Sequence, residues 1–292
     1  MSDLLTLTDL FDLRPESPTT WIGRADGQGL PHLFGGQLVA QSVVAAGLSA
    51  PRERSVHSLH TIFMRAGQVD TPVTYEVHSL RDGASVSSRQ VDAWQGSRLI
   101  CRSMLSLTEL EGGISHSRGN PSGATPEESI SLQDLAEPHG GLGQYWDGLS
   151  AVEIRVEPVG DPDPVTSPGR SPSAAAPRNV WMRAIHDLGD DPLYHRAAMA
   201  YASDLMLISA AVIPHGYDLG HEKQLAQDWN AVSLDHTVWF HRDTRADEWL
   251  LFEHASPGAH ASRALVMASI FDREGTTVGH VAQEALVRRR EG

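Results

Sequence analysis

Cysteine is almost absent from the sequence, because the 292 residues contain only Cys101. A single cysteine cannot form an intramolecular disulfide, and it is typical of a protein that works in a reducing compartment. Cys101 lies between Ile100 and Arg102 in a run with strand character, so we interpret it as a packing residue and not as a nucleophile. The cysteine content therefore predicts a cytoplasmic location.

Long apolar runs are also missing. The longest strongly apolar stretch, residues 205–213, is interrupted by Ser209 and ended by Pro214, whereas a membrane-spanning helix needs about 20 apolar residues. Residues 1–12 carry acidic side chains among leucines and lack the basic segment of a secretory signal. We therefore expect no membrane span, no membrane partner and no signal peptide.

Positive charge is scarce, because 23 lysines and arginines stand against 37 aspartates and glutamates, for a net charge of −14. This excess of acid argues against binding to nucleic acid or to an anionic membrane. An anionic substrate would need basic groups of its own at the binding site. We interpret the short basic run Arg288-Arg289-Arg290 as a solvated C-terminus, with a phosphate contact as the alternative.

Several motifs of catalysis and cofactor binding are missing as well. The sequence contains no G-x-S-x-G elbow, no Walker loop, no G-x-G-x-x-G after a strand and no H-E-x-x-H. Its 15 histidines suggest no metal site either, because His57 and His60, like His236 and His241, fall on opposite faces of their strands. We expect no cofactor and no metal.

The sequence does contain an internal duplication. In each half, an apolar helix candidate rich in small residues precedes several strand-like runs that are separated by turn signals. Each repeat is therefore predicted to be one helix followed by an antiparallel meander. Three short echoes relate the halves at an offset of about 175 residues: His60-Thr61 with His236-Thr237, Gly83-Ala84 with Gly258-Ala259, and Ser88-Arg89 with Ser262-Arg263.

Two stretches rich in glycine, serine, proline and acidic residues interrupt this pattern, at residues 111–143 and 160–178. Such compositions bury too little apolar surface to become strongly ordered. We therefore predict an N-terminal unit at residues 1–110, a linker at residues 111–150 and a C-terminal unit at residues 151–292 that carries the catalytic residues.

The second helix candidate, residues 197–214, is apolar or small on every face and carries one charged side chain, Asp204. A helix of this kind is normally surrounded by protein, and a sheet wrapped around it would provide that burial. A carboxylate in its middle must be hydrogen-bonded or have a raised pKa. Asp204 is then either a structural group or a general base, and the first helix candidate has no acid between Gln37 and Ala50.

Six segments, in their order and spacing, resemble those of the acyl-CoA thioesterase II (TesB) family: LFGGQLVAQ at residues 33–41, HSLHTIFMRAG, LRDGASVSSRQV, YASDLMLI, SLDHTVWFHR and VAQEALVR. The similarity covers most of the chain and lapses between residues 111 and 178. The resemblance implies an α+β fold, the double hotdog, in which each of two repeats has a central helix wrapped by an antiparallel sheet. It also implies an enzyme that hydrolyses fatty acyl-CoA to free fatty acid and CoA, and a homo-oligomer, either dimer or tetramer.

The same resemblance implies a catalytic trio that activates water, formed by Asp204 in YASD, Ser233 two positions before an Asp-His pair, and Gln283 in VAQE. Asp204 would take a proton from water that Ser233 and Gln283 hold beside the thioester carbonyl. Each partner also has a structural interpretation, with Ser233 as an ordinary strand-end residue and Gln283 as an amide bonded to a backbone carbonyl. Gly35-Gly36 before the first helix is a candidate for oxyanion donors, or equally a tight turn.

The periodicity of the strand around Ser233 argues against this site. Ser233 has the opposite parity to Val232, Leu234 and Val238, so an ideal strand would point it away from the face that these apolar residues occupy. A bulge, or a site formed between the ends of two sheets, would bring Ser233 back toward Asp204.

Two other functions stay open on the same fold. An enoyl-CoA hydratase would need an Asp and a His close together on a loop and helix, where the second helix candidate offers only Asp204. A non-catalytic acyl-CoA-binding protein would bind its ligand without turnover.

Overall fold

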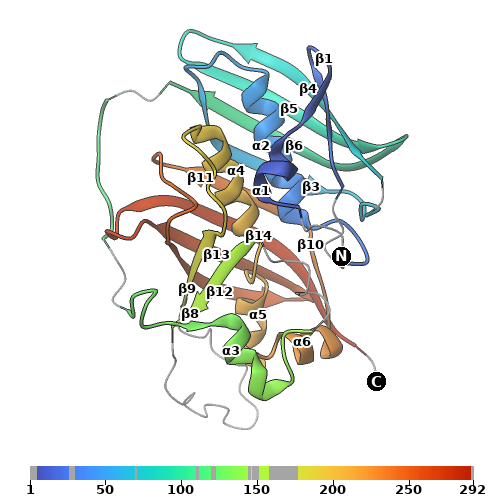
Figure 1. Cartoon of the computed structure of the whole chain (residues 1–292). Helices are drawn as coiled ribbons and strands as arrows, with labels where there is room; N and C mark the ends of the chain where they lie inside the picture. Colours follow the sequence, from blue (N-terminus) through green and yellow to red (C-terminus); the bar gives the residue numbers. More distant parts are fainter. Residues whose placement is uncertain are drawn as a thin grey trace.

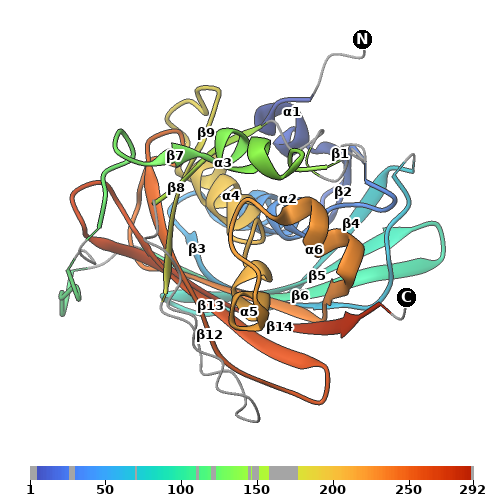
Figure 2. The same cartoon turned by 90° about the horizontal axis from the view of Figure 1, so that it is seen from below.

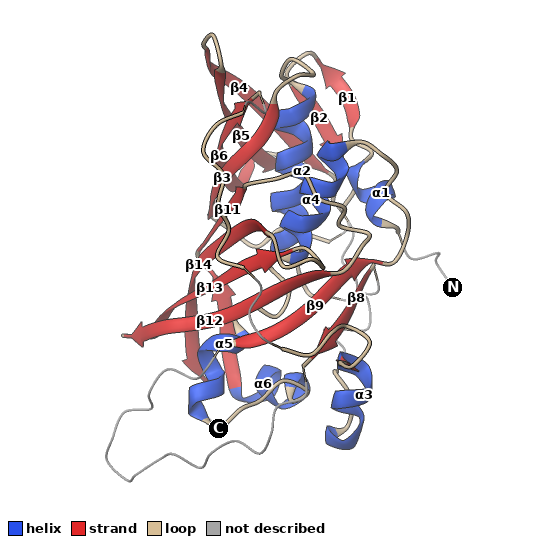
Figure 3. Cartoon of the chain, turned by 90° about the vertical axis from the view of Figure 1, so that its left-hand side faces the viewer, coloured by secondary structure: helices blue, strands red, loops and turns tan. Residues whose placement is uncertain are grey.

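A computed structural model of the chain describes residues 5–25, 30–69, 71–109, 112–119, 123–143, 146, 151–157 and 177–290. In this part of the chain, fourteen antiparallel strands form one long sheet, and the helices lie against it (Figures 1 and 3). Figure 2 shows the sheet curving around two central helices, α2 (Gly35–Leu48) and α4 (Pro192–Ala202). None of the helices among the described residues is both long and apolar enough to cross a membrane.

The first half of the sheet departs in part from the predicted helix and meander: β4, β5 and β6 form a meander, but β3, the first strand after α2, pairs with β6, and β1 and β2 precede the helix. From the centre outward its strands lie in the order β3-β6-β5-β4-β2-β1. A short helix, α1 (Leu7–Phe11), packs on α2. The strands are β1 (Arg14–Ser17), β2 (Thr20–Gly23), β3 (Ser55–Phe63), β4 (Val73–Asp82), β5 (Val86–Gln95) and β6 (Arg98–Thr108).

The second half repeats this arrangement, with the order β11-β14-β13-β12-β9-β8 from the centre outward. The two halves join where β3 and β11 pair as antiparallel neighbours. One extra strand, β10, also pairs with β14. The strands are β8 (Val152–Val156), β9 (Arg178–Ala184), β10 (Trp229–Ser233), β11 (Asp235–Phe240), β12 (Leu250–His260), β13 (Arg263–Phe271) and β14 (Thr277–Arg289).

The central helices are built from small and apolar residues, so they can pack closely on each other as well as on the sheet. Residues 36–46 of α2 are all buried, as expected for a helix that is apolar on every face. Helix α4 begins at Pro192, and the Asp191 side chain caps it by accepting the Leu193 N–H. The two helices contact each other, and the rings of Phe34 and Tyr201 meet edge to face at 5.0 Å.

The helix predicted at residues 197–214 is not continuous, which corrects the sequence-based prediction. Helix α4 ends at Ala202, Met206 has a left-handed φ of 59°, and a short helix, α5, covers only Ser209–Val212. Tertiary hydrogen bonds stabilise the break, because the Ser203 hydroxyl reaches the Ala200 carbonyl and a histidine of the sheet. Asp204 therefore lies just beyond the end of a helix and not in the middle of one.

Two other segments add structure outside the repeats. Within the predicted linker, β7 (Ile130–Ser131) pairs with β8, and it leads into α3 (Leu132–Ala136) and the 3₁₀ turn η1 (Glu137–His139). The second half also carries η2 (Ile213–His215) and α6 (Glu222–Asp228) between α5 and β10. Most of the predicted loop at 160–178 lies outside the described residues.

Candidate active site

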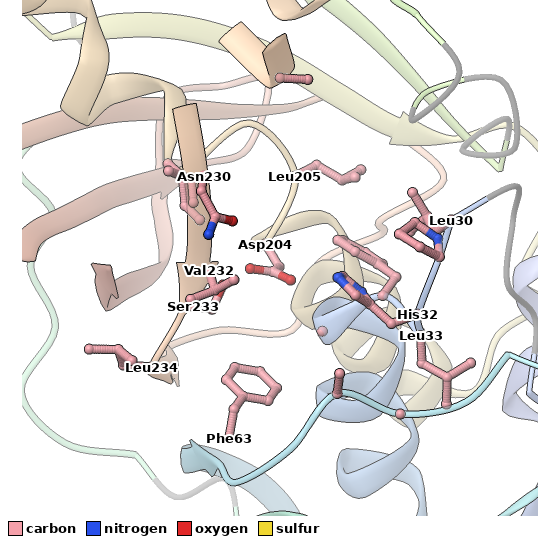
Figure 4. Close-up of a pocket in the computed structure, with 18 of the residues that line it drawn as sticks. Leu30, His32, Leu33, Phe63, Asp204, Leu205, Asn230, Val232, Ser233 and Leu234 are labelled. Atoms are coloured by element: carbon pink, nitrogen blue, oxygen red, sulfur yellow. The ribbon is translucent and has the colours of Figure 1, made fainter. Parts of the chain in front are cut away.

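A cavity of about 570 Å³ lies between the start of α2, the break after α4, helix α6 and strand β10. Apolar side chains form much of its wall, among them Leu33, Phe63 and Leu205 (Figure 4). Asp204 and Ser233, both predicted from the sequence, also line it. An apolar cavity with a few convergent polar groups is typical of a site for a small molecule with a hydrophobic part.

Asp204 is the central polar group of this cavity, and only 5% of its side chain is exposed. Its carboxylate accepts hydrogen bonds from the Gly36 backbone N–H and from the side chains of Ser233 and Gln283. Burial raises the pKa of Asp204, because the charged form loses its hydration, while nearby His236 and the hydrogen bonds act in the opposite direction. The carboxylate is thus fixed in position and is a stronger base than an exposed aspartate.

The first half of the chain contributes directly to this site. Gly35-Gly36 form the first turn of α2, and the Gly36 N–H faces the Asp204 carboxylate, which is a favourable place for negative charge. Gly35 lies so close that an added Cβ would be 2.8 Å from Asp204 Oδ2. The glycine pair therefore lies against the Asp204 carboxylate, whereas its two sequence-based interpretations were a tight turn and a pair of oxyanion donors.

A bulge resolves the parity conflict at Ser233. Ser233 in β10 lies opposite Ala285 of β14, while Thr237 in β11 lies opposite Ala282, so this side has one residue more than β14 over the same distance. The extra residue falls at the interruption around Leu234, which separates β10 from β11. As a result Ser233 faces the cavity, although it is out of phase with the buried residues of β11.

Gln283 is completely buried on β14 and lies behind Ser233 and Asp204. Its Nε2 donates to Ser233 Oγ at 2.9 Å. Its Oε1 lies 2.5 Å from His236 Nδ1, which must be the donor because a carbonyl oxygen only accepts. The structure thus brings together all three predicted residues, Asp204, Ser233 and Gln283, in one hydrogen-bonded network.

His236 is a residue of this network that the sequence-based prediction missed. It is fully buried in β11, with Nε2 2.8 Å from Ser203 Oγ and Nδ1 3.8 Å from Asp204 Oδ1. Its two ring nitrogens contact Ser203, in the break after α4, on one side and Gln283 on the other. The signal for it was present in the sequence, because it follows Ser233 by three residues and shares the parity of the apolar residues Val238 and Phe240.

Two family profiles match the chain, one in each half of the fold. The family described as acyl-CoA thioesterase matches residues 163–286. The family described as acyl-CoA thioesterase N-terminal domain matches residues 22–108. The two matches together span both central helices and most of the strands around them.

The chain is also similar to individual proteins over nearly its whole length. It is 32% identical to human acyl-coenzyme A thioesterase 8, over 97% of this chain and 88% of the relative. The structure of acyl-CoA thioesterase II TesB2 from Mycobacterium marinum is similar with a TM-score of 0.78 at 31% identity, covering 98% of this chain and 100% of that one. A hot dog fold protein from Alicyclobacillus acidocaldarius, with a TM-score of 0.72 at 15% identity over 98% of each chain, supports the fold alone. With the strand order, these similarities confirm the predicted double hotdog.

Proposed function

Because this chain belongs to the acyl-CoA thioesterase II family, a family of thioester hydrolases, we propose that it hydrolyses fatty acyl-CoA with water activated at Asp204. The observation that carries this proposal is a buried carboxylate of raised pKa in an apolar cavity, bonded to both Ser233 and Gln283. The cavity takes the acyl chain, and the thioester carbonyl lies beside Asp204 where the cavity wall becomes polar.

In this mechanism Asp204 is the general base. Water held against its carboxylate gives a proton to Asp204 as the oxygen attacks the thioester carbon. The C–S bond then breaks, the protonated Asp204 returns the proton to the leaving sulfur, and CoA leaves as the thiol. The fixed position of the carboxylate lowers the entropic part of the barrier. Its raised pKa makes it a stronger base than an ordinary aspartate.

The hydrogen-bond directions determine how Ser233 and Gln283 take part. His236 Nδ1–H donates to Gln283 Oε1, which leaves the Gln283 amide nitrogen to donate to Ser233 Oγ. The Ser233 hydroxyl hydrogen is then the one that is donated to Asp204. We assign Ser233 the task of holding the water in the cavity, Gln283 that of holding it through its hydrogen bond to Ser233, and His236 that of a positioning residue behind them.

The two alternative functions differ from this proposal in what they require of the site. A hydratase needs a histidine that reaches the substrate, and His236 does lie near Asp204. However, His236 is fully buried, does not line the cavity and has both nitrogens within hydrogen-bond distance of Ser203 and Gln283. A non-catalytic binding protein would have no use for a buried base of raised pKa.

Purified protein is expected to release free CoA thiol from saturated acyl-CoA esters of short, medium and long chain, measured by reaction of the thiol with a chromogenic disulfide. Because the cavity is apolar and about 570 Å³ in volume, turnover should depend on the length of the acyl chain. Binding of these esters without thiol release would favour the non-catalytic protein. Hydration of an enoyl-CoA in place of thiol release would favour the hydratase.

Activity should fall as the pH is lowered through the pKa of Asp204. Above this pKa the carboxylate is ionised and accepts a proton, whereas below it the protonated acid cannot. Burial raises this pKa, so the acid limb of kcat/KM should have its midpoint above the ordinary aspartate value of 3.8. The measurement is kcat/KM from about pH 4 to about pH 9, and a profile without such a limb would contradict the role of Asp204.

Organisation and location belong to the same proposal. The separate family matches at 22–108 and 163–286 support units at residues 1–110 and 151–292, joined by residues 111–150. The resemblance to the family supports a dimer or tetramer, which light scattering would test. The single cysteine supports a cytoplasmic location.

A further inference from the structure

A second cavity, of about 510 Å³, lies at one end of β14. This end of the strand leads to the C-terminus (Figure 1). Arginines line it from two strands, Arg288 and Arg289 from β14 and Arg263 from the start of β13. The β12–β13 hairpin holds Arg263 beside β14, because the Val287 N–H donates to the Ser262 carbonyl. We call Arg263, Arg288 and Arg289 the arginine cluster.

The arginine cluster is locally basic in a chain whose net charge is −14. Among the described residues, no ion pair includes Arg288 or Arg289, and Arg263 is 3.5 Å from Glu284. The other nearby acid, Asp228, accepts the hydroxyl of Tyr217. Positive charge thus remains available for an anion, and arginine is well suited to phosphate because it donates several hydrogen bonds in one plane.

The arginine cluster and the proposed active site are joined by a single wall residue. Trp229, the first residue of β10, lines both the acyl cavity and the second cavity. It pairs with Arg289, while Ser233 at the other end of the strand pairs with Ala285. Strand β10 therefore runs from the water-holding serine directly to the arginine cluster.

The length of β10 matches the length of the arm in CoA. Four residue steps from Ser233 to Trp229 correspond to about 13 Å at ~3.3 Å per residue. The pantetheine arm, from the thioester sulfur to the first phosphorus, has about as many bonds as four extended residues, or about 15 Å. A thioester beside Ser233 would therefore bring the phosphates of CoA to the vicinity of Trp229 and Arg289.

We propose that the arginine cluster binds the phosphate groups of the CoA nucleotide, with the pantetheine arm lying along β10. This proposal rests on the proposed thioesterase function, since it names the site for the leaving-group half of the same substrate. It also gives Arg288-Arg289 the phosphate contact that was the alternative to a solvated C-terminus.

The test compares two substrates with one acyl chain, decanoyl-CoA and decanoyl-pantetheine, of which only the first has phosphates. In the double variant Arg288→Gln/Arg289→Gln we expect KM for decanoyl-CoA to rise about tenfold, because charge-assisted hydrogen bonds to phosphate are lost, while kcat/KM for decanoyl-pantetheine stays as in the wild type. The control is Arg52→Gln/Arg98→Gln, which removes two exposed arginines of the other half and should leave both values unchanged.

Binding of adenosine 3′,5′-bisphosphate, followed by calorimetry, tests the arginine cluster without any turnover. The wild type and the control should bind it with an affinity that falls as salt is added, and the Arg288/Arg289 variant should bind it at least about tenfold more weakly. Equal binding by variant and wild type, or an equal KM for decanoyl-CoA, would overturn the proposal. Failure of the wild type to hydrolyse either thioester would instead overturn the proposed function, while the binding measurement would still decide the anion site.

Discussion

Replacement of Asp204 by Asn should lower kcat for acyl-CoA hydrolysis by about a thousandfold. Among the described residues, the substitution removes the only carboxylate that both lines the cavity and contacts Ser233 and Gln283. Asn has nearly the same shape as Asp but cannot take a proton from water. The substrate should still bind, since the apolar wall is unchanged. The measurement is kcat and KM for decanoyl-CoA, together with binding of a non-hydrolysable acyl-CoA thioether.

Stability separates this loss of chemistry from a loss of fold. A buried acid whose folded pKa is raised lowers stability at pH above that pKa, and the effect disappears below the unfolded value near 3.8. Asp204→Asn removes this burden, so its thermal midpoint at neutral pH should not fall by more than a few degrees. Asp190→Asn, at a fully exposed carboxylate, is the matched control and should keep wild-type kcat. If Asp204→Asn keeps kcat within a few-fold, Asp204 is a structural residue.

The repeated architecture was predictable from the sequence because it depends on local signals. An apolar helix candidate rich in small residues preceded the strand-like runs of each half, and turn signals between those runs predicted the hairpins β4–β5–β6 and β12–β13–β14. The break after Ala202 was not predictable in this way. It is stabilised by bonds from Ser203 and Asp204 to residues of other elements, which no local pattern contains.

Two details of the site depend on strand register and could not be predicted from periodicity. A bulge lies near Leu234 because β10 and β11 pair with different parts of β14. An ideal strand would point Ser233 away from Asp204, and the extra residue of the bulge removes this conflict. The echo of His60 by His236 is similarly misleading. His60 is exposed on the outer face, whereas Thr61, which pairs with His236, shares the buried face.

Of the proposed catalytic trio, Asp204 was indicated by pattern, as the one charged residue of an apolar segment, whereas Ser233 and Gln283 came from the family resemblance. Ser233 and Gln283 each have ordinary structural interpretations, and only their three-dimensional relation to Asp204 distinguishes them. His236 shows the limit of that resemblance, because its parity marks it as buried but does not indicate that it orients Gln283. The comparison of the two repeats assigned the chemistry to the second half, because the first helix has no buried acid. The first half nevertheless takes part, since its Gly36 N–H donates to the Asp204 carboxylate of the second half.

Gly35→Ala is the second substitution expected to have a large effect, although it adds only one methyl group. That methyl would lie 2.8 Å from Asp204 Oδ2 and 3.2 Å from Phe63 Cζ, both closer than ordinary contact. Asp204 must then shift, and its bonds to the Gly36 N–H, Ser233 and Gln283 shift with it. A displacement of about 1 Å at a reacting group can reduce the rate about a hundredfold, so kcat for decanoyl-CoA should fall by that order.

Stability should respond much less than activity to Gly35→Ala. Alanine favours a helix over glycine by about 1 kcal/mol, which offsets part of the 1–3 kcal/mol that overpacking of this size costs. The matched control is Gly258→Ala, where an added Cβ has no neighbour within 4 Å among the described residues. A crystal structure of Gly35→Ala should show the carboxylate moved away from Ser233. If both glycine variants retain full kcat, the position of Asp204 does not control the reaction, and a base elsewhere in the cavity must be sought.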